Sequence, residues 1–80
     1  MSRARDVVEV VARALASRPD DVEVIEAERG GQTVVELVMG AGELGRVIGR
    51  QGRTAAAVRA LASAAGELEG LDVAVDFRDD

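Results

Sequence analysis

The stretch that decides the fold of this chain spans residues 47–54 and reads Val-Ile-Gly-Arg-Gln-Gly-Arg-Thr. Two aliphatic residues lead into a Gly-x-x-Gly loop that carries a cation, and a segment with helical character follows at once. Glycine at both ends lets a ligand approach the backbone closely, because no Cβ is in the way. The start of a helix presents unpaired N–H groups and the positive end of its dipole, which favour a phosphate. The sequence therefore predicts an anion-binding loop at residues 49–52.

The composition allows a small domain with few catalytic options. Its 80 residues suffice for one domain, and we expect a single domain over residues 1–80 with a core of about residues 4–78. Cysteine and histidine are absent, which removes the thiolate nucleophile, the commonest general base and the commonest metal ligand. No apolar run is long enough to span a bilayer, and the first residues are polar, unlike a signal segment. We expect a cytoplasmic protein without membrane contact that is not an enzyme and uses no cofactor.

Charge is distributed unevenly along the chain. Fifteen acidic and ten basic residues give a net charge of −5, whereas nucleic-acid-binding proteins are usually basic. Residues 44–66 contain four arginines and no acid, so this segment carries +4 and the remainder carries −9. A local basic surface on an acidic protein can still hold a polyanion. The alternative is a solvated helix face, which fits Arg46 and Arg59 better than Arg50 and Arg53.

Periodicity in the first half predicts a helix and a β-hairpin. The helix begins after Ser2 and ends before Pro19; its expected apolar positions are Val7, Val8, Val11, Ala14 and Leu15. Two β-rich runs, residues 22–29 and 32–39, surround a pair of glycines that is typical of a two-residue turn. The turn pairs Arg29 with Gln32 and Val24 with Leu37. One face then carries Val22, Val24, Val35, Leu37 and Met39, while the other carries Glu23, Ile25, Glu36 and Val38, as a sheet covered on one side requires.

The second half predicts two helices and a strand. A short helix over residues 43–48 precedes the loop, and an alanine-rich helix over residues 54–65 follows it. We expect Val58, Leu61 and Ala65 on the buried stripe of the second helix, and Gly66 at its end. Alternating apolar residues then indicate a half-buried strand; they are Leu71, Val73, Val75 and Phe77. The order α-β-β-α-α-β predicts a two-layer α+β fold.

This order, with the Gly-x-x-Gly loop between two helices after the second strand, resembles the type II KH fold. The aliphatic pair before the loop and the small residues after it match the pattern of KH domains, which bind single-stranded RNA or DNA. Over nearly its whole length the chain looks most like the small stand-alone bacterial KH proteins of the KhpA family. Residues 43–53 carry that likeness, with arginine where lysine is often seen. A departure is the glycine-rich segment 40–42, where the family more often has a proline or an acidic residue before the short helix.

The resemblance implies a site around the loop. Backbone N–H groups of residues 49–52 contact the sugar-phosphate backbone of single-stranded RNA, and Arg50 and Arg53 add charge-assisted contacts. Residues of the second strand, with the aliphatic pair, are candidate walls of a groove for the bases. The candidate RNA-binding residues are Arg46, Val47, Ile48, Gly49, Arg50, Gln51, Gly52, Arg53 and Thr54. Phe77 is the only aromatic residue and is expected in the core, so no aromatic stacking platform of the RRM or OB type is expected.

The resemblance also implies protein partners. They are a second copy of the chain, or a larger KH- and R3H-containing protein of the KhpB or Jag family. A three-stranded sheet has edges that can pair with a partner, and bivalency would offset the weak binding of one small domain. A protein-interaction module is therefore the alternative function. The implied cellular role is that of an RNA chaperone or regulator of bacterial transcripts, with effects on cell shape and cell-wall organisation.

A second glycine motif lies just upstream of the loop. Residues 40–45 spell G-x-G-x-x-G after an expected strand, which is the fingerprint of dinucleotide-binding proteins. That fingerprint needs a long helix to follow it, whereas Gly49 interrupts the helix here. A nucleotide-binding protein is therefore only a remote alternative.

Overall fold

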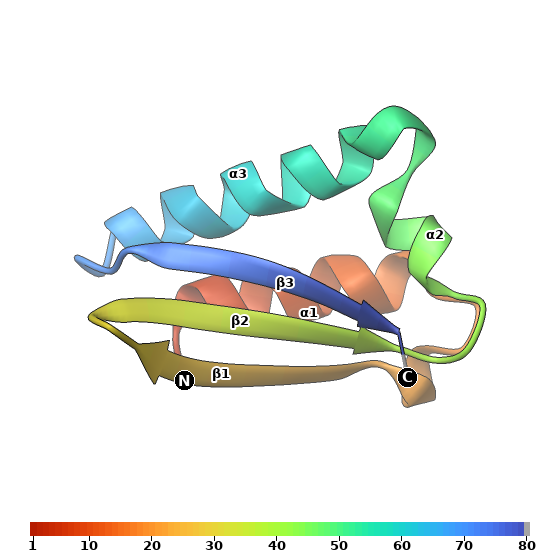
Figure 1. Ribbon diagram of the computed structural model, residues 1–80, viewed down its shortest axis with the longest axis horizontal. Coiled ribbons are helices and arrows are strands. Elements are labelled where there is room, and N and C mark those ends of the chain that lie inside the picture. Colours follow the sequence, from red (N-terminus) through yellow and green to blue (C-terminus); the bar gives the residue numbers. More distant parts are fainter. Residues whose placement is uncertain (80) are drawn as a thin grey trace.

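The computed structural model describes residues 1–79 and arranges them in two layers, with a three-stranded sheet and helices on one face of it (Figure 1). The elements in chain order are α1 (Arg3–Leu15), η1 (Pro19–Asp21), β1 (Glu23–Arg29), β2 (Gln32–Met39), α2 (Leu44–Ile48), η2 (Arg50–Gly52), α3 (Arg53–Glu67) and β3 (Val73–Asp79). The predicted α-β-β-α-α-β order and the two-layer α+β class are confirmed.

The sheet is mixed, with β2 in the centre. β1 pairs with β2 antiparallel in the predicted register, including Arg29 opposite Gln32 and Val24 opposite Leu37. β3 pairs with the other side of β2 and runs parallel to it. The chain crosses from β2 to β3 through α2 and α3, which places the loop between these helices at one end of the molecule (Figure 1).

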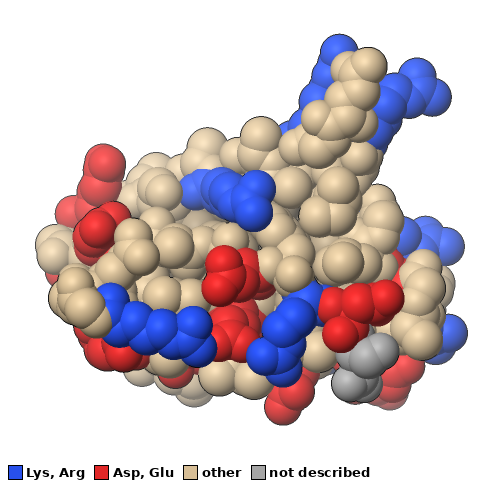
Figure 2. All heavy atoms as spheres, viewed as in Figure 1, with Lys and Arg blue, Asp and Glu red and all other residues tan. Residues whose placement is uncertain are grey.

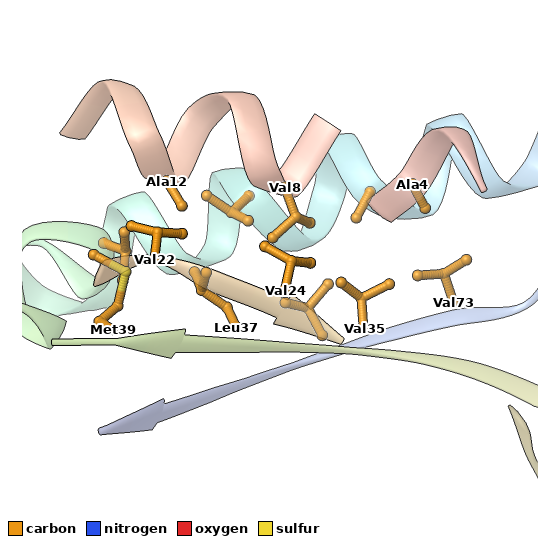
Figure 3. Close-up of a cluster of buried hydrophobic side chains, with 13 residues drawn as sticks. Ala4, Val8, Ala12, Val22, Val24, Val35, Leu37, Met39 and Val73 are labelled. Carbon is orange, nitrogen blue, oxygen red and sulfur yellow. The ribbon is translucent and has the colours of Figure 1, made fainter. Parts of the chain in front are cut away.

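The core lies between the sheet and the helices (Figure 3). The expected apolar sheet face is correct, because Val22, Val24, Val35, Leu37 and Met39 are all buried. Side chains from the helices complete the cluster; they include Ala4, Val8, Ala12, Val58 and Ala62.

The buried stripe of each long helix differs from the prediction. In α1, Ala4, Val8 and Ala12 are buried, whereas the predicted Ala14 and Leu15 are exposed. These three residues, spaced four apart, form a line on α1 that faces both α3 and the sheet. The small side chains of the two alanines allow α1 to approach its neighbours closely. In α3 the buried residues are Ala55, Val58, Ala62 and Gly66, and Leu61 is 52% exposed. The prediction that Leu61 is buried, which was based on its hydrophobic side chain, is therefore wrong, because mostly small residues line the buried side of α3.

Gly66 was predicted to end α3, but it lies within the last turn of the helix. A Cβ at this position would collide with the side chain of Val73 at the start of β3. The absence of a side chain therefore lets α3 pack directly against β3. The helix ends one residue later, at Glu67, and Gly70, with φ +71°, helps turn the chain into β3.

Two valines on the outer face of the sheet are also buried. Val34 and Val38 belong to the central strand, where neighbouring strands cover both sides. Glu36 lies between them and is 7% exposed. Its carboxylate accepts hydrogen bonds from Arg29 (2.7 Å) and Arg78 (2.9 Å), one from each flanking strand. This pairing with two arginines satisfies an acid that the central strand would otherwise bury unpaired.

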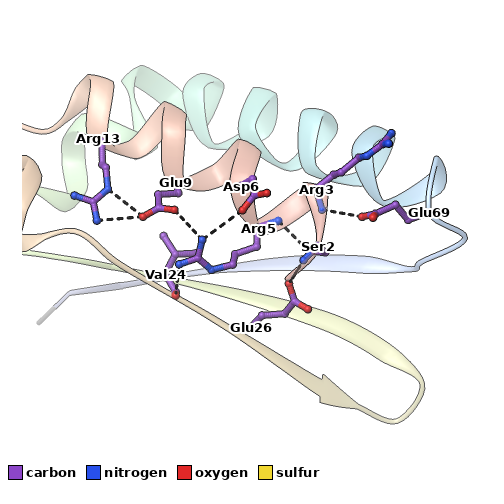
Figure 4. Close-up of polar contacts among 9 residues, drawn as sticks. All are labelled: Ser2, Arg3, Arg5, Asp6, Glu9, Arg13, Val24, Glu26 and Glu69. Atoms are coloured by element: carbon purple, nitrogen blue, oxygen red, sulfur yellow. Dashed lines mark hydrogen bonds and ion pairs between the residues drawn. The ribbon is translucent and has the colours of Figure 1, made fainter.

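Polar contacts fix the start of α1 (Figure 4). Ser2 caps the helix as predicted, because its Oγ accepts a hydrogen bond from the Arg5 backbone N–H at 3.1 Å. The Ser2 hydroxyl and backbone N–H both donate to Glu26 of β1, and these bonds lower the pKa of Glu26. The Arg3 backbone N–H donates to Glu69 beyond α3 at 2.7 Å. The N-terminus of α1 is thereby tied to the end of the molecule opposite the loop.

Candidate nucleic-acid interface

Residues 49–52 form a tight projection between α2 and α3 with an unusual backbone. Gly49 ends α2 with φ 74° and ψ 174°, a conformation that is essentially restricted to glycine. Gln51 (φ 56°) and Gly52 (φ 72°) follow in the left-handed region, and the Gly52 N–H donates to the Gly49 carbonyl at 3.2 Å. The loop is therefore a tight turn closed by its own hydrogen bonds, in which the Arg50 and Gln51 N–H groups have no backbone acceptor within residues 1–79.

The two glycines of the loop are required for different reasons. A Cβ at Gly49 would collide with the side chain of Thr54 and lie 3.1 Å from its backbone nitrogen. At Gly52 a Cβ would meet no atom within 4 Å. Gly49 is thus needed for both its conformation and its space, whereas Gly52 is needed for its conformation alone. The role expected for Thr54 is structural in part, because its side chain packs against the loop from inside.

Gln51 is the only non-glycine residue with positive φ among residues 1–79. A β-carbon in this region costs roughly 1–2 kcal/mol relative to the right-handed region. Its side-chain carbonyl accepts a hydrogen bond from Arg53 Nη2 at 3.2 Å. Strain of this kind is concentrated where a backbone shape serves binding, and at this loop it holds the shape that presents the N–H groups.

The arginines of the acid-free segment are not equivalent. Arg50 and Arg53 are exposed, and neither takes part in an ion pair within residues 1–79. In Figure 2 basic side chains cover the projecting tip, and acidic side chains lie on the body below it. Arg46, by contrast, donates from its Nε to Glu43 at 2.9 Å. Two of the unpaired positive charges of the region therefore lie at the loop, on Arg50 and Arg53.

Glu43 is the residue that sequence reasoning missed. It is 5% exposed, and its Oε1 accepts hydrogen bonds from the Ser17 N–H (2.7 Å), the Ser17 hydroxyl (2.8 Å) and the Arg18 N–H (3.0 Å). The Ser17 hydroxyl chiefly, with these backbone groups and Arg46, lowers the pKa of Glu43 to about 2 although burial opposes the shift. Glu43 precedes α2 without capping it by a side-chain hydrogen bond. Its carboxylate instead joins the start of α2 to the segment after α1.

The expected groove walls need correction. Val47 is fully buried, so it supports the loop from the core and does not line a surface. Ile48 is half-buried and reaches the surface beside the loop. The expectation that the second strand forms a wall is wrong, because β2 is the central strand and residues 33–39 are all buried. β3 is the strand that lies beside α2 and α3.

A hollow of about 430 Å³ lies at the other end of α3. Its lining includes Ser63, Glu67 and Asp72. Two carboxylates repel a polyanion, so this hollow does not compete with the loop as a phosphate-binding surface. The upstream glycine motif lacks the helix that its fingerprint needs, since α2 has only five residues. None of the helices within residues 1–79 has the length and apolar character to cross a membrane.

Comparison with known proteins places this loop and fold in a family. The model described as KhpA/KhpB, KH domain matches residues 5–77. The chain belongs to this family of KH domains. Three relatives named RNA-binding protein KhpA illustrate the likeness. The protein of Aquifex aeolicus is 41% identical over 96% of this chain and 98% of its own length. The protein of Halalkalibacterium halodurans is 40% identical over 94% of this chain and 99% of its own length. The protein of Mycobacterium leprae is 44% identical over 92% of this chain and 89% of its own length. This KH domain thus spans nearly the whole length of its relatives.

Proposed function

We propose that this KH domain binds single-stranded RNA, with the loop of residues 49–52 holding the sugar-phosphate backbone. The observation that carries the proposal is the coincidence of two properties in one loop. Its backbone has an unusual conformation in which the Arg50 and Gln51 N–H groups have no backbone acceptor within residues 1–79. Arg50 in the loop and Arg53 directly after it have no acidic partner within the same residues. Oriented N–H groups and free guanidinium groups are the two donors that phosphates prefer.

The following helix supports the same reading. The Arg53 N–H at the start of α3 donates to the Arg50 carbonyl, and no side chain caps this N-terminus, which leaves its end of the helix dipole without a side-chain acceptor. The positive end of a fifteen-residue helix therefore faces the loop. Binding in this mode is sequence-tolerant, because phosphate contacts position a strand without reading its bases.

Charge reversal at the loop tests the proposal. Arg50→Asp with Gln51→Asp removes one cation and adds two anions, and aspartate tolerates the left-handed conformation at position 51 better than most residues. We expect binding to a short single-stranded RNA to be lost in fluorescence anisotropy, with an unchanged circular dichroism spectrum. Retained affinity in a folded variant would refute the proposal.

A matched control changes the charge by the same amount far from the loop. Arg3 and Val10 lie on α1 and are exposed, and the N-terminus of α1 contacts the opposite end of α3. Arg3→Asp with Val10→Asp is expected to retain most of the RNA affinity. Equal losses in both double variants would assign the effect to net charge and not to the loop.

A second proposal concerns self-association through α3. Ala57, Leu61, Ala64 and Leu68 are all exposed and follow one another at spacings of four, three and four residues. Leu61 is 52% and Leu68 is 76% exposed, and this spacing is that of an interhelical seam. We propose that this seam joins two copies of the chain or a KH- and R3H-containing partner of the KhpB or Jag type, leaving the loop free.

Analytical ultracentrifugation tests the seam. Leu61→Glu with Leu68→Glu is expected to give a monomer where the parent chain sediments as a dimer, while Val10→Glu on α1 leaves the dimer intact. A parent chain that stays monomeric and also fails to capture such a partner would contradict the proposal. An interaction module without RNA binding would capture its partner after nuclease treatment and yield no crosslinked RNA.

The cellular role that we propose is that of a cytoplasmic RNA chaperone or post-transcriptional regulator, with effects on cell shape and the cell wall. Sequence-tolerant contacts of a single small domain suit brief binding to many transcripts. Crosslinking followed by sequencing of the bound RNA from cells tests this role. A restricted set of bound transcripts would indicate regulation, whereas broad binding would indicate a chaperone, and no enriched RNA would contradict both.

A further inference from the structure

Arg59 and Phe77 form a stacked pair at the surface beside the loop. The Arg59 guanidinium carbon lies 4.8 Å from the centre of the Phe77 ring. Its Nε donates to the Val75 carbonyl of β3 at 3.4 Å, so the side chain reaches from α3 across to the edge strand. Two elements that run side by side in Figure 1 are thereby bridged by one guanidinium group.

The ring supports the arginine from the rim of the core. Phe77 is half-buried and packs against the core cluster; it lies opposite Leu37 in the sheet register. The prediction that Phe77 lies in the core is therefore correct for only part of its ring. The remainder is covered by Arg59, whose guanidinium group lies over the ring in a cation–π arrangement.

The outer face of Arg59 is open. The residue is exposed, and it takes part in no ion pair within residues 1–79. Like Arg50 and Arg53, and unlike Arg46, it is therefore without an acidic partner in that range. A solvated surface arginine would be free to rotate, but this one is fixed by a ring behind it and a carbonyl beside it.

The pair lies within reach of a strand bound at the loop. Arg59 follows Gly52 by seven positions in the sequence, which corresponds to about 10 Å along α3 at 1.5 Å per residue. Nucleotides are at least 3.4 Å apart along a strand, so roughly two or three of them cover this distance. A strand that leaves the loop along α3, on the side that faces β3, therefore reaches Arg59.

We propose that Arg59, held over the Phe77 ring, is the stacking platform for one base of the RNA strand whose phosphates bind at residues 49–52. The inference rests on the proposed function of the loop and adds to it a base contact. Unstacked bases in single-stranded RNA pack on aromatic rings and on guanidinium planes. The chain has no exposed aromatic platform, and Arg59 supplies the flat surface in its place. Such a contact selects unpaired bases of any type, because every base has a π face.

Arg59→Lys tests the platform, because lysine keeps the charge and removes the plane. We expect a loss of affinity of about fivefold or more, as for removal of one stacked base, with the dependence on salt unchanged. Arg3→Lys is the matched control and is expected to bind as the parent chain does. An unchanged affinity of Arg59→Lys would overturn the proposal.

An abasic scan of the RNA makes the test specific. In the parent protein, one abasic position in a short single-stranded RNA is expected to lower the affinity about fivefold or more. In Arg59→Lys the same position is expected to have no further effect. Phe77→Leu, which fills the core but lacks a ring, is expected to behave likewise. An abasic penalty that persists in Arg59→Lys would overturn the proposal.

The experiments distinguish a failure of the Arg59 proposal from a failure of the loop proposal. If Arg50→Asp with Gln51→Asp abolishes binding while Arg59→Lys has no effect, the loop proposal stands and the platform is refuted. If the parent chain binds no single-stranded RNA, both are refuted together. Circular dichroism of each variant shows whether the fold is retained.

Discussion

The arginines of the loop and the arginines of the outer sheet face differ in what surrounds them. On the sheet, Arg29 and Arg78 both donate to one carboxylate, Glu36, so each of them is held in an ion pair. At the loop, Arg50 and Arg53 have no acidic partner within residues 1–79. The same residue type thus stabilises the fold in one region and is left for a ligand in the other. Net charge therefore says little about binding in this chain.

The backbone of the two regions differs as well. The hairpin of β1 and β2 follows a regular register from Glu23 to Arg29, and its two turn glycines have open space around them. The loop combines Gly49 and Gln51 in conformations that few residues adopt. In the hairpin, left-handed backbone is confined to the two turn glycines, whereas the loop combines it with a glycine, Gly49, whose missing Cβ makes room for Thr54.

The largest expected effect comes from Gly49→Ala. The backbone conformation is essentially restricted to glycine and the new Cβ would strike Thr54, so we expect the free energy of unfolding to fall by about 2–4 kcal/mol. Gly52→Asn, with open space and a left-handed backbone, is expected to cost about 1 kcal/mol or less. Urea denaturation of both variants checks this difference. Equal costs would show that the loop is not fixed as described.

A smaller effect separates the two groups of arginines. Arg53→Ala is expected to weaken RNA binding about tenfold and to lower the slope of log affinity against log salt by about 0.7. Arg29→Ala, on the sheet, is expected to leave that slope unchanged because Arg29 is paired with Glu36 and belongs to a strand outside the loop. Anisotropy titrations at several salt concentrations measure both. A reduced slope for Arg29→Ala would place RNA on the sheet face.

The smallest expected effect is the pH dependence that Glu43 contributes to stability. Its pKa is about 2 in the fold, below the ordinary value of 4.5, so its contribution is complete above pH 4.5 and is lost as the pH falls through about 2. We expect the parent chain to be more stable than Glu43→Gln at neutral pH. The difference in melting temperature is expected to narrow between pH 4.5 and 2. A constant difference across this range would contradict the hydrogen bonds to Ser17 and Arg18.

Much of the fold is readable from the sequence, because local signals agree with one another. The glycine pair at positions 30–31 sets the hairpin register, and Ser2 and the Gly-x-x-Gly loop mark helix ends. The buried stripe of α3 was mispredicted at Leu61, since helical spacing alone does not say which face meets the sheet. The place of β3 beside β2 depends on a crossover between distant segments, and no local pattern encodes it.

Less of the candidate site than of the fold could be predicted from the sequence. The loop residues are contiguous, so their glycines and arginines are visible in the sequence. Glu43 and Ser17 are 26 positions apart, and only the fold brings them together. The same holds for Arg59 and Phe77, which meet across α3 and β3. The only local sign of Glu43 in the sequence is its position as the acid that directly precedes the acid-free segment.

Amide chemical-shift mapping tests the central claim most directly. Titration of the isotopically labelled chain with a short single-stranded RNA is expected to shift the amide signals of residues 49–54 most, and to leave those of β1 nearly unchanged. The loop would then be the surface that holds the strand. Shifts confined to the outer sheet face or to the hollow at the far end of α3, with the loop amides unmoved, would contradict it.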